Sequence, residues 1–239
     1  MNEGYKKFED GLRQLNIVLN QDQKEQFLKY YELLIEWNKV MNLTAITDFT
    51  EVIDKHFLDS LTMIKIYSLS NEKIIDVGTG AGFPGIPLKI AFPNTKIVLL
   101  DSLRKRINFL DEVIKSLRLD GIETIHGRAE DLGKDTKYRE KFDVCTSRAV
   151  ANLATLAEYC LPFVKVGGNF ISYKSGDVTE ELNLAKKATG LLGGSIDEIK
   201  IFPLPGTDID RSLIKIKKDS RTPMKFPRTP GKPSKEPLL

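Results

Sequence analysis

The sequence predicts an α/β protein, built on a seven-stranded sheet with one antiparallel strand and preceded by an N-terminal helical extension. Three observations carry this prediction. Apolar residues recur at helical spacing through the first 70 residues, short β-branched runs alternate with helical segments after residue 73, and the last two runs are joined only by a turn. The chain has 239 residues, of which 41% are hydrophobic, and this is enough for one sizeable core.

The helical extension comprises residues 1–70. Its apolar side chains follow each other at three- and four-residue intervals, as in the series Phe27, Tyr30, Tyr31, Leu34, Trp37 and Met41. The polar stretch NLTAIT at 42–47 interrupts this pattern, and Asp48 or Thr50 could cap the helix that follows. We expect the extension to pack on the core domain.

The core domain, residues 71–218, alternates strands with helices. Strands are expected at 73–77, 96–100, 122–125, 142–146 and 168–173, and helices at 86–91, 104–117, 152–163 and 179–190. Such alternation predicts a parallel sheet covered on both faces. Two further runs, 196–202 and 212–217, are separated only by the turn-like PLPGTD segment, so they predict a closing antiparallel hairpin.

The C-terminal residues 219–239 differ in composition from the rest. They contain five prolines, which predicts an extended, polyproline-like arm without regular structure. Residues 211–239 hold nine Lys and Arg against two acidic residues, whereas the remaining chain has a net charge of −4. This asymmetry fits a region that meets a polyanion, and it equally fits a solubilising tail.

Composition also limits the class of protein. No apolar run approaches the roughly 20 residues needed to span a bilayer, and the N-terminus is charged where a signal peptide would be apolar. We therefore expect a cytoplasmic protein. Cys145 and Cys160 have no metal-ligand spacing and are too few for a disulfide framework, so we expect no metal site.

A glycine-rich loop, IIDVGTGAGFPG at 74–85, follows the first strand. Glycines after a strand allow a tight turn and close approach of a ligand to the backbone. The dinucleotide pattern G-x-G-x-x-G fails when it is read from Gly78, because Phe83 stands where the third glycine should be. Read from Asp76, the loop suits S-adenosylmethionine better, and Gly78 and Gly80 are its candidate contacts.

Two acidic positions follow at the next strand ends. Asp101 lies 23 residues after Gly78, where a carboxylate can accept both ribose hydroxyls of either cofactor class. After the third strand comes GRAED at 127–131, so Ala129 and Glu130 stand at a further strand end and are candidates as well. Alone, Glu130 could equally be a helix N-terminal acid. Ligands of α/β proteins bind at the carboxyl ends of strands. The glycine loop, Asp101 and this acidic loop all lie at such ends, so together they indicate a ligand site.

The whole pattern resembles a known fold. Five helix-separated strands and a closing hairpin are similar to the Rossmann-like class I methyltransferase fold, which uses S-adenosylmethionine. A nicotinamide-binding Rossmann domain would instead have six parallel strands in two halves.

Several motifs resemble one family in particular. They are WNKVMNLTAIT (37–47), HFLDSL (56–61), IIDVGTGAGFPGIPLKI (74–90), LDSLRKRINFL (100–110), GRAEDL (127–132), SRAV (147–150) and the tail KFPRTPGKPSKEPL. With these motifs the chain resembles the bacterial glucose-inhibited division protein B (GidB) family, the RsmG-type methyltransferases of 16S ribosomal RNA. The resemblance covers nearly the whole chain.

The resemblance implies methyl transfer from S-adenosylmethionine to N7 of a guanine in the small-subunit decoding region. Carried over by position, the cofactor contacts would be Gly78, Phe83, Ala129, Glu130 and Arg148. Phe83 could alternatively be a core aromatic. The guanidinium of Arg148 would suit the methionyl carboxylate or an RNA phosphate.

The acid and base candidates remain without a role. His56 and Asp59 in HFLDSL are assigned no catalytic function, and the catalytic residues stay unknown. Guanine N7 already presents a lone pair, so no proton has to be removed before methylation. Cys145 lies in a predicted buried strand, which disfavours it as a nucleophile.

The expected partner is 16S ribosomal RNA or the small ribosomal subunit, bound by a monomer without membrane or metal. Arg221, Lys225, Arg228 and Lys232 would clasp phosphates, and Phe226 and Tyr173 could stack on bases. Two alternatives stay open at this point. One is an NAD-dependent oxidoreductase, and the other is a non-catalytic ribosome-assembly factor that binds RNA.

Overall fold

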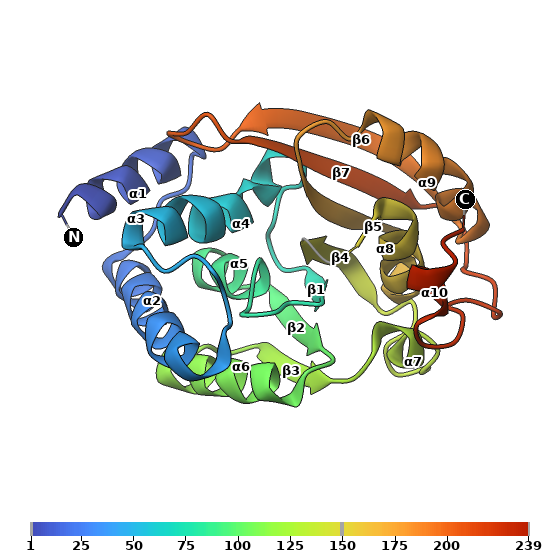
Figure 1. Cartoon of the computed structure of the whole chain (residues 1–239), viewed down its shortest axis with the longest axis horizontal. Helices are drawn as coiled ribbons and strands as arrows, with labels where there is room; N and C mark the ends of the chain where they lie inside the picture. The colour runs from blue at the N-terminus through green and yellow to red at the C-terminus, as the bar shows by residue number, and fades with distance from the viewer. Residues whose placement is uncertain (1, 149–150, 239) are drawn as a thin grey trace.

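A computed structural model describes residues 2–148 and 151–238. Its centre is a seven-stranded sheet in the order β3-β2-β1-β4-β5-β7-β6 (Figure 1). Only β7 runs against its two neighbours, β5 and β6. This confirms the predicted fold class. The strands are β1 Lys73–Val77, β2 Lys96–Asp101, β3 Ile122–His126, β4 Phe142–Arg148, β5 Val164–Ser175, β6 Gly194–Pro203 and β7 Asp210–Lys218.

Helices cover both faces of this sheet. Those of the core domain are α5 Gly85–Ala91, α6 Arg104–Ser116, α7 Ala129–Leu132, α8 Leu153–Cys160 and α9 Thr179–Leu191. Adjacent strand residues point to opposite faces, so Ile74 packs in the cluster that contains α5 and α6, and Ile75 in the cluster that contains α8 and α9. Burial on both faces explains why β1 and β2 are almost continuously apolar.

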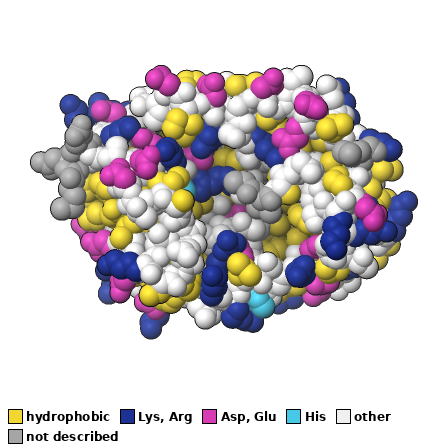
Figure 2. Space-filling view, in the orientation of Figure 1, with side chains coloured by type: hydrophobic (Ala, Val, Ile, Leu, Met, Phe, Trp, Pro, Cys, Tyr) yellow, Lys and Arg dark blue, Asp and Glu magenta, His cyan; other side chains and the backbone are white. Residues whose placement is uncertain are grey.

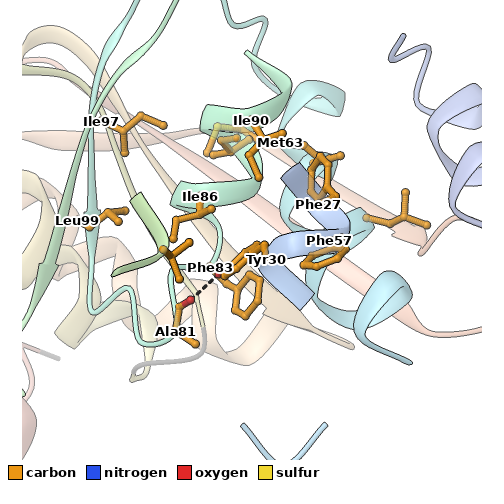
Figure 3. Packing of buried hydrophobic residues seen from close by; sticks show 14 of the residues in the cluster. Phe27, Tyr30, Phe57, Met63, Ala81, Phe83, Ile86, Ile90, Ile97 and Leu99 are labelled. Atoms are coloured by element: carbon orange, nitrogen blue, oxygen red, sulfur yellow. Dashed lines mark hydrogen bonds between the residues drawn. The ribbon is translucent and has the colours of Figure 1, made fainter. Parts of the chain in front are cut away.

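The helical extension packs on the α5 side of the sheet. It consists of α1 Asn2–Gln14, α2 Gln21–Met41, α3 Phe49–Val52, a π-helical segment Ile53–Leu58, α4 Asp59–Leu61 and a 3₁₀ turn Thr62–Lys65. Asn20 and Gln23 form a capping box at the start of α2, and the Asp48 side chain caps α3. Phe27, Tyr30 and Phe57 carry the contact to α5 and to the loop before it (Figure 3).

Two elements differ most from the sequence prediction, and the bounds of several others differ by one or two residues. The expected helix 152–163 ends at Cys160 and continues as a 3₁₀ turn, Leu161–Phe163, because Pro162 has no N–H for another α-helical bond. Strand β5 begins at Val164 rather than at 168, with Gly167 at φ +86 beside a shift in the register of its pairing with β4. A glycine pair that suggests a loop is here a bulge inside the strand.

The prediction of an extended C-terminal arm was wrong. The segment after β7 lies against the core domain and contains a short helix, α10 Lys232–Lys235. Phe226 is 4% exposed, and the Arg139 guanidinium donates to the carbonyls of Thr222 and Phe226 at 2.7 and 2.8 Å. The prolines of the segment lie at turns or pack against the core. No hydrogen bond of a helix or sheet is lost there through their missing N–H group.

No helix of the described part of the chain is long and apolar enough to cross a membrane.

Candidate functional site

A cavity of about 550 Å³ opens at the carboxyl ends of β1 to β4. All seven predicted cofactor contacts line it, namely Gly78, Gly80, Phe83, Asp101, Ala129, Glu130 and Arg148. The face shown in Figure 2 is hollowed near its middle, and Lys and Arg side chains gather around the hollow. The structure thus unites residues that are far apart in sequence, at the edge where α/β proteins bind ligands.

The glycine loop forms the floor of this cavity between β1 and α5. Gly78 and Gly80 have φ angles of +71 and +63, which favour glycine, and a Cβ on Gly80 would meet no atom within 4 Å. The Asp76 carboxylate accepts hydrogen bonds from Gly85 N at 2.9 Å and from the Thr79 hydroxyl at 2.7 Å. Asp76 is fully buried, and its pKa is raised to about 6 by burial. It therefore shapes the loop from beneath and does not line the cavity.

Asp101 joins the end of β2 to the glycine loop. Its carboxylate accepts hydrogen bonds from Gly80 N at 3.0 Å and Leu103 N at 2.9 Å, and from the Arg106 guanidinium at 3.2 Å. These contacts fix the orientation of the carboxylate at the cavity wall. A carboxylate held in this way is suited to accept hydrogen bonds from a ribose diol.

Phe83 is both a core residue and part of the cavity wall. Only 5% of it is exposed, and its ring lies 5.3 Å from the ring of Tyr30, which donates a hydrogen bond to the Ala81 carbonyl (Figure 3). The His56 ring stacks on Phe83 at 4.4 Å, and the Arg148 guanidinium lies 5.0 Å from its ring centroid. The helical extension therefore holds the loop that shapes the site.

A second cavity of about 500 Å³ adjoins the first across His56 and Arg148, which line both. Its wall contains a buried ion cluster that the sequence did not reveal. Asp59, which is 2% exposed, accepts from Arg148 at 2.9 Å and from Arg211 at 3.0 Å. The only sequence signal was the three-residue spacing of His56 and Asp59, since Arg211 counted merely as a charge near the tail.

His56 is held as a neutral imidazole. Burial lowers its pKa to about 3, and the positive charge of Arg148 contributes in the same direction. Its Nδ1 lies 3.2 Å from the Arg148 guanidinium, and its Nε2 lies 2.9 Å from the Thr44 hydroxyl. Nδ1 also lies 3.0 Å from the carbonyl oxygen of Lys55. A guanidinium can only donate and a carbonyl can only accept, so these two neighbours of Nδ1 call for opposite tautomers of the neutral ring.

Ala129 and Glu130 lie in the first turn of α7, at the other end of the first cavity. The Glu130 carboxylate accepts a hydrogen bond from Gly231 N at 2.8 Å, so the C-terminal segment reaches this wall. Tyr159 of α8 completes the wall beside them.

The predicted RNA contacts separate into two groups. Arg221, Lys225 and Lys232 have exposed side chains. Arg228 does not fit the prediction, because its guanidinium forms a bidentate ion pair with buried Glu158 at 2.7 to 3.1 Å. This pairing neutralises its charge.

The two predicted stacking residues differ in their surroundings. Phe226 of the C-terminal segment is buried in the cluster that contains α8 and α9, and Tyr173 is 2% exposed, with its hydroxyl donating to the Ser60 carbonyl at 2.6 Å. Phe226 therefore presents no face to a base, whereas Tyr173, although little exposed, is among the residues that line the second cavity.

Cysteine and metal chemistry find no support among the described residues. Burial raises the pKa of the Cys145 thiol well above its ordinary value, which disfavours the thiolate. Within ranges 2–148 and 151–238, no group of three His, Cys, Asp or Glu residues could hold a metal ion.

Comparison with known proteins adds sequence evidence to this geometry. The profile of the family described as GidB, rRNA small subunit methyltransferase G, matches residues 23–206. The ribosomal RNA small subunit methyltransferase G of Lachnoclostridium phytofermentans is 58% identical over 97% of this chain and 96% of its own length. The protein of the same name from Acetivibrio thermocellus is 54% identical over 96% of this chain and 94% of its own length.

Solved structures agree on the fold. P. horikoshii TYW2 in complex with MeSAdo superposes with a TM-score of 0.53 at 14% identity, covering 66% of this chain and 60% of that one. TrmN from Thermus thermophilus gives 0.52 at 13% identity, covering 70% and 53%.

Proposed function

The chain belongs to the rRNA small subunit methyltransferase G (GidB) family, and from this premise we propose that it methylates N7 of a guanine in 16S ribosomal RNA, using S-adenosylmethionine. The observation that supports this best is the pair of adjoining cavities that share His56 and Arg148. One has the residues expected of a nucleoside cofactor site, and the other offers space for a substrate beside it.

The residues of the first cavity fit the cofactor. Its volume of about 550 Å³ lies within the usual range for small-molecule sites. Asp101 would hold the ribose diol, Ala129 and Glu130 the adenine, and Gly78 with Gly80 the methionyl end. When bound, S-adenosylmethionine supplies an electrophilic methyl group. The glycine loop had left a choice between two cofactors, and membership of this family decides it in favour of S-adenosylmethionine.

The second cavity is proposed as the site of the target guanine. Arg148 and Arg211 face it together with Lys55, and only one of these arginine charges is balanced by Asp59. A cationic wall of this kind suits a nucleotide with its phosphates. A base must be turned out of its stack to enter such a pocket, which unpaired loops of RNA allow.

The chemistry that remains for the protein is positioning. N7 of guanine carries its own lone pair, so no side chain has to act as a general base. Neutral His56 and the fixed guanidinium of Arg148 form the boundary between the two cavities, where they would align the base with the methyl donor. Alignment of two reactants can contribute about 7 to 11 kcal/mol to lowering the barrier.

The wider assignments are part of the same proposal. The exposed side chains of Arg221, Lys225 and Lys232 would contact RNA phosphates, and the protein would act as a monomer in the cytoplasm, where its substrate is found.

Transfer of a labelled methyl group tests the function. Small subunits from a strain that lacks this protein would be incubated with it and with methyl-labelled S-adenosylmethionine, and the modified base would then be mapped. We expect incorporation at N7 of one guanine in 16S RNA. RNA binding without incorporation would instead support a non-catalytic assembly factor, and a label on another atom would refute the N7 assignment.

A further inference from the structure

The C-terminal segment, residues 219–238, reaches the candidate cofactor cavity from behind. Its contact is the hydrogen bond from Gly231 N to the carboxylate of Glu130, at 2.8 Å. Glu130 lines the cavity and is 6% exposed. A residue 101 positions away in sequence thus touches the acid proposed to recognise the adenine.

The local sequence explains why this amide is available. Thr229-Pro-Gly-Lys232 forms a turn in which Lys232 N donates to the Thr229 carbonyl at 3.0 Å. Gly231 has φ +82 and ψ −17, which are the angles of the third residue of a type II turn, with proline before it. The turn uses the N–H of Lys232 and leaves the N–H of Gly231 for Glu130.

Several buried contacts hold this turn in place. Arg228 pairs with Glu158 of α8, and the Thr155 hydroxyl of the same helix donates to the Pro233 carbonyl at 3.1 Å. On the other side, Arg139 donates both to the carbonyl of Gly133, which ends α7, and to the segment itself. The segment is therefore fixed against both helices that supply this wall of the cavity, and Figure 1 shows α10 beside α8.

We propose that the C-terminal segment is a positioning element of the cofactor site, and that its Gly231 amide orients the Glu130 carboxylate toward the adenine amino group. With Oε1 held by Gly231, Oε2 accepts the hydrogen bond from the exocyclic amino group. This role rests on the proposed function, and it is distinct from the contact with RNA phosphates that the exposed lysines of the segment would make.

The test uses two ligands that differ at the adenine edge. S-adenosylhomocysteine has the amino group that a carboxylate can accept from, whereas S-inosylhomocysteine has a carbonyl oxygen there, which a carboxylate repels. Affinities for both are measured by titration calorimetry. The full-length protein is expected to prefer the adenosyl compound by more than about tenfold, since a hydrogen bond to a charged group is at stake.

The main variant is a chain that ends at Pro230, and the matched control ends at Lys235. Both lose the residues from 236 on, but only the first loses Gly231 and α10. We expect the shorter chain to bind S-adenosylhomocysteine about five- to tenfold more weakly and the inosyl compound almost unchanged, because one oriented hydrogen bond is disturbed. The control should match the full-length protein. In a protein that already carries Glu130→Gln, ending the chain at Pro230 should not lower the affinity for S-adenosylhomocysteine any further.

A second pair of variants covers the case in which the shorter chain does not melt cooperatively. Full-length Gly231→Pro removes the N–H donor, whereas Gly231→Ala keeps it. Both introduce a Cβ at a position where no atom lies within 4 Å. Alanine disfavours the positive φ of this position, and proline, whose ring fixes φ at about −65°, excludes it. The preference for the adenosyl ligand should fall in the proline variant more than in the alanine variant.

An unchanged preference in both the shorter chain and Gly231→Pro would overturn the inference, as would an equal loss of affinity for both ligands, which indicates general loosening. A full-length protein that binds neither ligand would overturn the proposed function itself. That outcome is distinguishable, because it is seen before any variant is made.

Discussion

At the scale of single residues, the most consequential side chain is Asp59. Its buried carboxylate accepts hydrogen bonds from Arg148, at the end of β4, and from Arg211, near the start of β7. Two guanidinium groups would otherwise face each other across the second cavity. Asp59 therefore fixes the position of Arg148, the residue that both cavities share.

Substitution Asp59→Asn should remove the charge while keeping the shape. Loss of one partner from a buried ion cluster typically costs about 3 to 5 kcal/mol. The free energy of unfolding should therefore fall by an amount that approaches this range. Methyl transfer should fall at least about tenfold through misplacement of Arg148. Urea unfolding and single-turnover transfer measure the two effects.

The control for this variant is Asp54→Asn on the same segment. Asp54 pairs with Lys7 and lines neither cavity. Its substitution should leave the transfer rate per folded molecule unchanged. Equal rates for Asp59→Asn and Asp54→Asn would refute a positioning role for Asp59.

His56 predicts a dependence of stability on pH. Its pKa is about 3 in the folded protein and about 6.5 in the unfolded chain. Between about pH 3 and pH 6.5, the imidazole is therefore protonated in the unfolded chain but neutral in the folded protein. Stability should therefore fall as pH decreases from about 6.5 toward 3, by up to about 1.4 kcal/mol per pH unit from this group.

Chemical unfolding of the His56→Gln variant at pH 7.5 and pH 5 checks this sign. The loss of stability between the two pH values should be smaller than in the unsubstituted protein. His126→Gln is the matched control, because His126 is the other histidine of the chain and is exposed. If His56→Gln lost as much stability at pH 5 as the original protein does, the assignment of a neutral His56 would be wrong.

At the scale of elements, the loop between β1 and α5 is built by two glycines with different constraints. A Cβ on Gly82 would lie 2.6 Å from Ile86 and 2.8 Å from the Tyr30 hydroxyl, and its φ is +100. A Cβ on Gly80 would meet only open space, toward the cavity that this residue lines. One glycine therefore serves packing, and the other leaves room for a ligand.

Alanine at these two positions should have different effects. Gly82→Ala should lower the melting temperature strongly, because a clash adds to the roughly 1 to 2 kcal/mol cost of positive φ. Gly80→Ala should carry only the backbone cost but weaken cofactor binding. Thermal unfolding and calorimetric titration separate the two. A Gly80→Ala protein with unchanged affinity would show that the cofactor does not approach this part of the loop.

At the scale of the whole molecule, the cations of the basic C-terminal segment fall into two groups that its composition could not separate. Part of it is structural, with Arg228 neutralised by Glu158. Arg221, Lys225 and Lys232 keep exposed side chains. Lys235 is exposed as well, so these four cations, unlike Arg228, have side chains at the surface of the segment.

The salt dependence of RNA binding tests whether the exposed cations, and not Arg228, contact RNA. Replacing Arg221, Lys225 and Lys232 by glutamine should lower the slope of log affinity against log salt by about 2, since each lost phosphate contact contributes about 0.7 on single strands. Arg228→Gln should leave the slope unchanged and lower the melting temperature, because it leaves Glu158 buried without its partner. Equal slopes for the triple variant and the original protein would exclude these cations from the RNA interface.

The sequence by itself determined the order of the seven strands, the main helices between them and the seven cavity residues of the predicted cofactor site. Strand β1 was predicted to the residue, because a buried parallel strand must be apolar and the glycines that end it are local signals. Most of the candidate contacts were found because ligand residues of α/β proteins lie directly after strands, whereas Phe83 and Arg148 came from the family resemblance.

Only the tertiary structure decided which charges are free and which are paired. The Asp59 cluster joins three segments up to 152 positions apart, and Glu130 meets Gly231 across 101 positions. Composition could not show that Tyr173, Phe226 and Arg228 are used in packing, because burial and pairing depend on long-range contacts. The periodicity of a sequence records which face of an element is buried, but it does not record which partner buries it.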